Sequence, residues 1–362
     1  MVLTISFFST NVAAEITVGG EIKTILGSYF YENGDIKSNL TESLDLELFI
    51  PSFADTDAKV HFLIQNPDSG GINFKKLYLK HKFDDFYLTV GRQPVSWSFG
   101  SLLNPVDFSL GAVAMDQETM GKYQDAVEFY YPINWNSSFE LIAADNHLSD
   151  DLKWAVRGRT GFKGYDLTFN YVKEPVVNNS LLSILPIFEL TGSVADQQVN
   201  SMNRLGFTAK GDLGPIGAYT SVGYYKIKEL TDSSYSYLLG GDYSFTYNYD
   251  KKITLQLEYL SLQDEILINY MKTGMGIDNI GNSIDLILGN VNYPIDDFSS
   301  IGLFIVSSLD DGSIVLMPVY KNQLPGNIKL SLSSSIFVSE KEKILSGQGI
   351  NAGTELSLSY AF

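Results

Sequence analysis

Charged side chains recur at even spacing in several segments of the chain, with apolar residues between them. In an extended strand alternate residues point to opposite faces, so charges at even spacing share one face. The basic residues placed in this way are Lys76, Lys80, Lys82, Lys153, Arg157, Arg159, Arg204 and Lys210. The acidic ones are Asp45, Glu47, Glu128, Glu140, Asp166, Asp242 and Glu258. Facing rows of opposite charge can set which ions pass along a surface. The alternative is that these charges neutralise one another and only solvate a wide interior enclosed by the strands.

The residues needed for catalysis or for binding a cofactor do not form a recognisable constellation. The chain has no cysteine and three histidines, of which only His147 lies among carboxylates, beside Asp145, Asp150 and Asp151. No serine stands in a nucleophile-elbow context, and the acidic clusters lack EF-hand spacing. Phosphate-binding loops and dinucleotide fingerprints do not occur. The sequence therefore predicts a protein that is not an enzyme and has no cofactor and no metal site.

Strict period-two alternation is the main signal along the chain. In residues 355–362, Leu356, Leu358, Tyr360 and Phe362 alternate with small or polar residues. The same pattern predicts eighteen strands, with sixteen as the alternative. The predicted strands are 16–28, 42–50, 58–66, 73–83, 85–91, 123–131, 137–145, 152–161, 165–173, 203–212, 216–228, 235–247, 251–262, 283–292, 298–307, 313–322, 326–338 and 352–362.

The connections between these strands alternate between short turns and longer polar segments. The longer ones are 29–41, 92–122, 174–202, 263–282 and 339–351. This alternation is typical of an up-and-down antiparallel barrel with a different rim at each end, and it places both termini on the short-turn side. We therefore expect an all-β transmembrane barrel formed by one domain, residues 15–362, in which the basic and acidic residues named above line the pore.

A soluble β-sandwich also alternates, so the membrane assignment depends on composition. Charged residues make up only 19% of the chain, although 42 acidic residues outnumber 25 basic ones. Aromatic residues, Tyr29, Tyr130 and Tyr225 among them, gather at strand ends, where the interfacial girdles of a barrel lie. The acidic balance argues against nucleic acid as a partner. These features favour a barrel in the outer membrane of a two-membrane bacterium, surrounded by lipid.

Both ends of the chain carry features that bear on export and assembly. Residues 1–14 resemble the apolar core and small-residue cleavage site of a signal peptide, but they lack its positive start. The alternative for this stretch is an ordinary first strand. The terminal Phe362 resembles the C-terminal assembly signal of outer-membrane barrels, which implies the barrel-assembly machinery as a partner. A homotrimer and a monomer are both compatible with the sequence.

Segment 92–122 is too long for a simple connection and too apolar for a disordered one. Its candidate functional residues are Arg92, Trp97, Asn104, Asp107, Asp116 and Glu118. We expect it to fold inward and constrict the lumen; the alternative is an external cap packed on its own apolar residues. Segment 174–202 is a second candidate plug.

One motif carries a family resemblance. Gly91-Arg92-Gln93 at the end of a strand, followed by Trp97 and Asn104-Pro105-x-Asp107, resembles porin-like outer-membrane channels of the alginate-export and related groups. The resemblance implies a large single-chain barrel through which ions or small hydrophilic solutes diffuse passively. Four arginines are few for an exporter of polyanions. The other functional reading is a structural or adhesion barrel of the outer membrane whose lumen is plugged.

Overall fold

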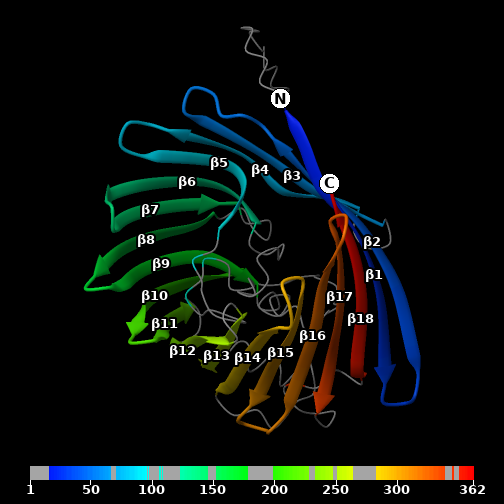
Figure 1. Cartoon of the computed structure of the whole chain (residues 1–362). Helices are drawn as coiled ribbons and strands as arrows, with labels where there is room; N and C mark the ends of the chain where they lie inside the picture. The colour runs from blue at the N-terminus through cyan, green and yellow to red at the C-terminus, as the bar shows by residue number, and fades with distance from the viewer. Residues whose placement is uncertain are drawn as a thin grey trace.

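The computed structural model shows eighteen antiparallel strands joined into one closed sheet (Figure 1). It describes residues 16–66, 71–95, 97, 106, 108, 123–145, 152–177, 199–227, 233–247, 251–263, 283–338, 345 and 350–362. The segment expected to be a signal peptide, 1–14, lies outside these residues. Among them, no helix is long and apolar enough to cross a membrane.

Each strand pairs with the next one in the chain, and the last pairs with the first. The strands are β1 (Thr17–Tyr31), β2 (Ile36–Phe49), β3 (Thr56–Gln65), β4 (Ile72–Lys82), β5 (Tyr87–Pro94), β6 (Tyr123–Asn134), β7 (Ser137–Ala144), β8 (Lys153–Phe162), β9 (Tyr165–Val177), β10 (Val199–Leu213), β11 (Ile216–Ile227), β12 (Ser233–Tyr247), β13 (Lys251–Leu262), β14 (Ile284–Pro294), β15 (Ser299–Ser308), β16 (Ile314–Leu324), β17 (Ile328–Val338) and β18 (Ile350–Ala361).

The predicted fold class and strand number are confirmed. Closure is completed at the end of the chain, where the backbone amide of Gly20 donates to the carbonyl of Phe362 at 3.1 Å. The amide of Phe362 returns a bond of 3.0 Å to the carbonyl of Gly20. The barrel therefore has no open side between its first and last strands, as an up-and-down membrane barrel requires.

Turns and longer connections alternate from one end of the barrel to the other. The turns at 135–136, 163–164 and 214–215 lie at one end, and the strand ends that flank residues 95–122, 178–198 and 263–283 lie at the other. Both termini lie at the short-turn end (Figure 1). Here "upper" denotes the end with the long connections.

Two of the expected long connections are shorter than predicted at both ends. Most of 29–41 is strand, because β1 continues to Tyr31 and β2 begins at Ile36, with Gly34 at a φ of 88° in the turn between them. In the same way β9 continues to Val177 and β10 begins at Val199. Polar residues near the rim interrupt the apolar alternation without interrupting the strand. The alternation therefore predicted strands that are shorter than the observed ones.

The outer face of the barrel is apolar. Outward residues such as Leu257, Phe169 and Leu358 are 64%, 57% and 50% exposed. A soluble protein rarely leaves so continuous an apolar surface in water. In a closed barrel, which satisfies its own backbone hydrogen bonds, this band fits the hydrocarbon of a bilayer. The protein is thus a transmembrane β-barrel of the outer-membrane type.

Aromatic side chains mark both edges of this apolar band. Near the upper end the rings of Trp154 and Tyr171 lie 5.2 Å apart. At the other end the Tyr360 and Phe362 rings stack at 6.3 Å. The register places three tyrosines that the sequence assigned to the girdles, Tyr29, Tyr130 and Tyr225, on the inward face instead.

The inner face is buried along one part of the wall and accessible along another. Because the wall is a single sheet, an inward side chain far from the rims can be buried only by atoms inside the barrel. Ile142 on β7, Leu238 on β12 and Leu260 on β13 have no exposed surface. Accessible inward residues instead follow the wall from β16 through β18 and β1 to β4: Lys321, Lys329, Ser331, Ser333, Ser357, Lys23, Glu47 and Lys76.

Candidate functional site: the inner wall and the segment after β5

The chain leaves the wall just after β5. Gly91 has a φ of 120°, in the region that favours glycine, and a Cβ there would collide with the carbonyl of Leu77. Further along, Val95, Trp97, Val106 and Phe108 are buried, and none is more than 5% exposed. The backbone conformation at Gly91 thus occurs within the last residues of β5, four positions before Val95, the first buried residue of the segment.

The described part of the segment packs on small and apolar residues of the inner face. Val95, Trp97 and Phe108 form one buried cluster with wall residues from β6 to β9. The wall residues are Ala126, Ile142, Ala144, Ala155 and Val172. Small side chains at these inward positions leave room for the two aromatic rings, whose centroids lie 5.4 Å apart.

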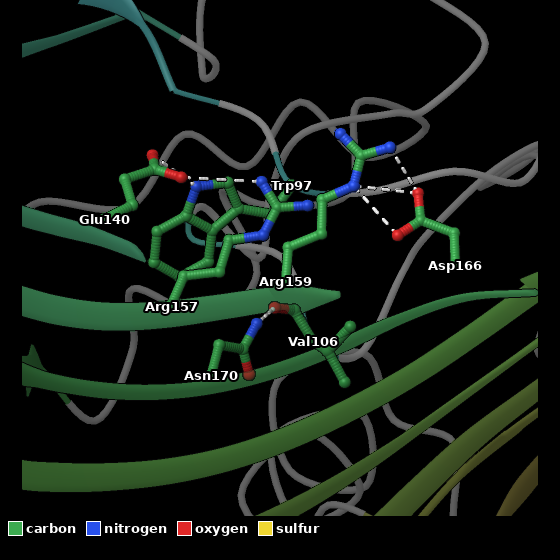
Figure 2. A network of polar contacts seen from close by, with 7 residues as sticks. All are labelled: Trp97, Val106, Glu140, Arg157, Arg159, Asp166 and Asn170. Atoms are coloured by element: carbon green, nitrogen blue, oxygen red, sulfur yellow. Dashed lines mark hydrogen bonds and ion pairs between the residues drawn. The ribbon is translucent and has the colours of Figure 1, made fainter. Parts of the chain in front are cut away.

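Trp97 is held by two charged residues of the wall. Its indole Nε1 donates a hydrogen bond of 3.0 Å to Oε1 of Glu140 on β7. Arg157 on β8 lies with its guanidinium carbon 5.5 Å from the centre of the indole ring, and its Nη1 lies 3.6 Å from Oε2 of Glu140. Figure 2 shows the three side chains together on the inner face. The charge pair therefore fixes the orientation of the tryptophan.

The wall also binds the backbone of the segment. Nδ2 of Asn170 on β9 donates to the carbonyl of Val106 at 2.7 Å, as Figure 2 shows. Gly206 on the neighbouring strand lies opposite Asn170, and a Cβ at this glycine would come within 2.8 Å of the Val106 side chain. The absence of a side chain at Gly206 thus lets the segment approach the sheet closely.

A buried charge triad lies beneath Phe108. Glu174 accepts from Nζ of Lys153 at 2.8 Å, and its other oxygen lies 2.7 Å from Nε of Arg204. Arg204 also donates to the carbonyl of Phe108 at 2.8 Å, and Nζ of Lys153 lies 4.2 Å from the centre of the Phe108 ring, over its face. Burial of the three charges is compatible with stability because they are paired and hydrogen-bonded.

The triad differs from what the sequence predicted for its members. Lys153 and Arg204 were expected to line the pore, but only 10% and 3% of their side-chain surfaces are exposed. Sequence reasoning missed Glu174 because it ended the strand at residue 173. The signal was present, since Asn170, Val172 and Glu174 continue the inward alternation up to Pro175.

Other predicted charges remain accessible on the inward face. Arg159 on β8 donates from Nε to both oxygens of Asp166 on β9, at 2.8 and 2.9 Å (Figure 2). Their side chains are 53% and 37% exposed. The register places the remaining accessible charges on the same face: Lys76, Lys80, Lys82, Lys210, Glu47, Glu128 and Asp242.

Two more of the predicted acidic residues are engaged with neighbouring side chains. Asp45 on β2 contacts His61 on β3 and accepts from Nζ of Lys75 at 2.5 Å. The register shifts between His61 and Phe62, so Lys75 is the extra residue of a β-bulge on β4 and points inward beside Lys76. Sequence reasoning did not identify Lys75, because strict alternation has no place for two consecutive inward residues.

Glu258 on β13 is the second engaged carboxylate, and it is 1% exposed. It accepts from the hydroxyl of Tyr219, and Nε2 of Gln256 donates to it at 2.8 Å. The same Gln256 nitrogen donates to the Tyr219 hydroxyl at 2.7 Å. This group is part of a buried network rather than a free charge of the lumen.

The first residue of the expected constriction loop lies elsewhere. Arg92 belongs to β5 and shares the outward face with Leu77, where Nη1 lies 2.8 Å from Oδ2 of Asp125 on β6. Since β5 extends to Pro94, the connection begins three residues later than expected. The expected positions Asn104, Asp107, Asp116 and Glu118 lie outside the described residues.

No group of three or more metal-ligating side chains that could hold an ion occurs in the described part of the chain. What the inner wall offers instead is a set of paired buried charges that fix the segment, together with accessible charges and hydroxyl groups. Such an arrangement can orient and screen polar solutes, since donors and acceptors line the surface.

No protein-family model matches the chain, and no curated protein matches it either. Solved structures do, over nearly its full length. A BenF-like porin from Pseudomonas fluorescens is 9% identical, with a TM-score of 0.57 over 96% of this chain and 98% of the porin. Wzi, an outer-membrane carbohydrate-binding β-barrel of Escherichia coli, is 12% identical, with a TM-score of 0.58 over 97% and 86%.

A third solved structure is OmpT of Vibrio cholerae in its trimer form. It is 12% identical, with a TM-score of 0.50 over 96% of this chain and 99% of OmpT. These neighbours are porins and other outer-membrane β-barrels, and at such identities the likeness establishes the fold alone. The chain has the porin type of fold.

Proposed function

We propose that this protein is an outer-membrane channel through which ions or small hydrophilic solutes diffuse passively. The observation that carries the proposal is the unequal burial of the inner face. The inward side chains of β7–β9 on which the segment after β5 packs, such as Ile142, Ala155 and Val172, are buried, whereas Lys321, Ser331 and Lys76 are accessible elsewhere on the wall. An accessible polar strip inside a closed apolar shell is the surface that a water-filled passage needs.

In this mechanism segment 92–122 constricts the lumen from the β6–β10 side. Support comes from its described residues: Trp97 and Phe108 pack on the inner wall, and Asn170 and Arg204 bind backbone carbonyls of the segment. Solute would then diffuse between this segment and the wall from β16 to β4. Neither an energy source nor a covalent step is needed.

The accessible charges of the inner wall would set the ion preference. Arg159 and Asp166 neutralise one another, so their pair contributes a dipole more than a net charge. The accessible lysines at positions 76, 80, 82 and 210 act against Glu47, Glu128 and Asp242. Because charges of both signs line the passage, we expect moderate rather than steep selectivity.

The test is conductance across a planar lipid bilayer containing the purified, folded protein. We expect discrete current steps under an applied voltage, with no energy source added. Protein whose folding is verified by a heat-dependent gel shift, and which gives no steps, would contradict the channel.

One observation favours the alternative, a plugged structural or adhesion barrel. Leu238, Leu260, Leu288 and Val306 point inward from β12–β15, and none is more than 1% exposed. Apolar burial on this scale means that part of the lumen is filled. Folded protein that remains electrically silent would support this second function.

A further inference from the structure

We infer that the inner wall formed by β16, β17, β18 and β1 carries a binding site for small oxyanions. Three lysines define this lysine site: Lys321 on β16, Lys329 on β17 and Lys23 on β1. The inference extends the proposed function, since it assigns a class of solute to one part of the passage. It also makes a claim about binding that does not depend on conductance.

The strand register brings the three lysines onto one patch. Lys23 and Lys329 both lie directly opposite Ser359 of β18, one on each side of it. Lys321 lies opposite Ser331, two residues from Lys329 along β17. Neighbouring strands are about 4.8 Å apart, so the Cα atom of Lys329 lies within about 10 Å of those of Lys23 and Lys321, which are themselves about 16 Å apart. Flexible four-carbon stems then allow the ammonium groups to converge on one small ligand.

The lysine site differs from other basic positions of the inner wall in its lack of carboxylate partners. Lys75, Lys153, Arg157, Arg159 and Arg204 are each within ion-pair distance of an Asp or Glu. Within the described residues, Lys23, Lys321 and Lys329 have no such pair, and all three are exposed. In a chain with a net charge of −17, three unpaired lysines within four consecutive strands of the barrel form a local excess of positive charge.

Acidic residues near the lysine site do not cancel this excess. Glu21 shares the inward face of β1 with Lys23, but it lies toward the short-turn end, opposite Asp45. Glu355 lies toward the upper end and accepts a hydrogen bond of 3.2 Å from the hydroxyl of Tyr29. The lysines are thus flanked by carboxylates above and below, with none between them in the register.

The side chains around the lysines complete the recognition chemistry. Ser331 and Ser357 face inward beside them, and Gln323 lies opposite Lys329. Hydroxyl and amide groups donate to oxygen atoms, and ammonium groups add charge-assisted bonds. The site offers no aromatic face at these positions for stacking. Its chemistry therefore fits a compact oxyanion such as phosphate or a small carboxylate.

Calorimetric titration of the full-length, detergent-folded protein with inorganic phosphate at low salt tests the site directly. The test variant is Lys23→Gln, Lys321→Gln, Lys329→Gln. The control variant, Lys163→Gln, Lys173→Gln, Lys226→Gln, removes the same charge from a turn and from outward positions. We expect the test variant to bind phosphate about tenfold more weakly or worse, because charge-assisted bonds are lost. The control variant should bind like the wild type.

Absence of phosphate binding by the wild type, or equal weakening in both variants, would overturn the inference. A heat-dependent gel shift confirms that each variant is folded before it is used. In a bilayer, the test variant should also shift the reversal potential toward cations and relieve phosphate block of the current. If the wild type is electrically silent, the channel proposal fails while the calorimetry still decides the site.

Discussion

Arg204 donates a hydrogen bond of 2.8 Å to the backbone carbonyl of Phe108, a residue 96 positions earlier in the chain. The same guanidinium contacts Glu174, which in turn binds Lys153. One arginine thus links the buried charges of the wall to the segment inside the barrel. The position of that segment depends on a hydrogen bond to its backbone, so its side-chain sequence alone does not determine where it lies.

Arg204→Met should loosen the segment and destabilise the barrel. The substitution leaves Glu174 with one cation and the Phe108 carbonyl without this donor, and breaking a buried pair costs about 3–5 kcal/mol. Urea unfolding in detergent micelles measures the change. Arg159→Met is the matched control, because its half-exposed pair with Asp166 contributes about 0–1 kcal/mol. Equal effects of the two substitutions would argue against the buried linkage.

Trp97→Ala should widen the lumen. Removal of a buried aromatic side chain costs about 3–5 kcal/mol, and here it also removes the hydrogen bond to Glu140. Single-channel conductance should rise and become noisier as the segment loses its anchor. Trp135→Ala is the control, since this tryptophan lies in a turn and is 94% exposed, whereas Trp97 is 5% exposed. An unchanged conductance in Trp97→Ala would place the constriction elsewhere.

Gly91→Ala should disturb the exit of the chain from β5. Alanine is strained at a φ of 120°, and its Cβ would meet the backbone of Leu77 and Tyr78. We expect a lower urea midpoint and altered conductance. Gly289→Ala is the comparison, because nothing lies within 4 Å of the position that its methyl group would occupy. A neutral Gly91→Ala would show that the exit tolerates another backbone path.

Leu332→Lys and Ser333→Lys should have opposite outcomes although they are neighbours on β17. Leu332 is 44% exposed on the outward face, where a lysine at mid-depth costs about 2–4 kcal/mol. Ser333 faces inward opposite Glu355, where an ammonium group meets water and a carboxylate. The yield of folded barrel in lipid vesicles measures both. Equal tolerance of the two lysines would contradict the assignment of the faces.

Phe362→Ala should reduce assembly in cells more than refolding in detergent. The ring is 48% exposed on the outer face beside Tyr360, so it is free to be recognised, while its backbone bonds to Gly20 do not need the side chain. Heat-shifted barrel in membrane fractions measures assembly, and refolding of purified chain measures the fold. Equal losses in both assays would remove the argument for a recognition signal.

The fold was predictable because side-chain alternation is a local property of the sequence. Leu356, Leu358 and Tyr360 alternate with small residues, and the structure places them outward on β18. Alternation failed where the backbone departs from the regular ladder. The bulge at Lys75 and the start of β2 at Ile36 required knowledge of the neighbouring strand, which one sequence does not provide.

The inner wall was less predictable than the fold because burial inside a barrel depends on long-range packing. Lys153 and Arg159 have the same alternation and the same charge, yet one lies buried beneath Phe108 and the other faces solvent. Which of the two occurs depends on where a distant segment lies. The surroundings of Lys23 likewise follow from the register, which sets serines rather than carboxylates directly opposite it on β2 and β18.

The reciprocal bonds between Gly20 and Phe362 also constrain how the chain can reach its final form. Contacts between residues so distant in sequence form late, since loop closure must precede them. Until β18 pairs with β1, both strands present an unsatisfied edge that can pair with another chain. During barrel assembly the protein therefore passes through a stage that is prone to aggregation, which ends only when its first and last strands pair.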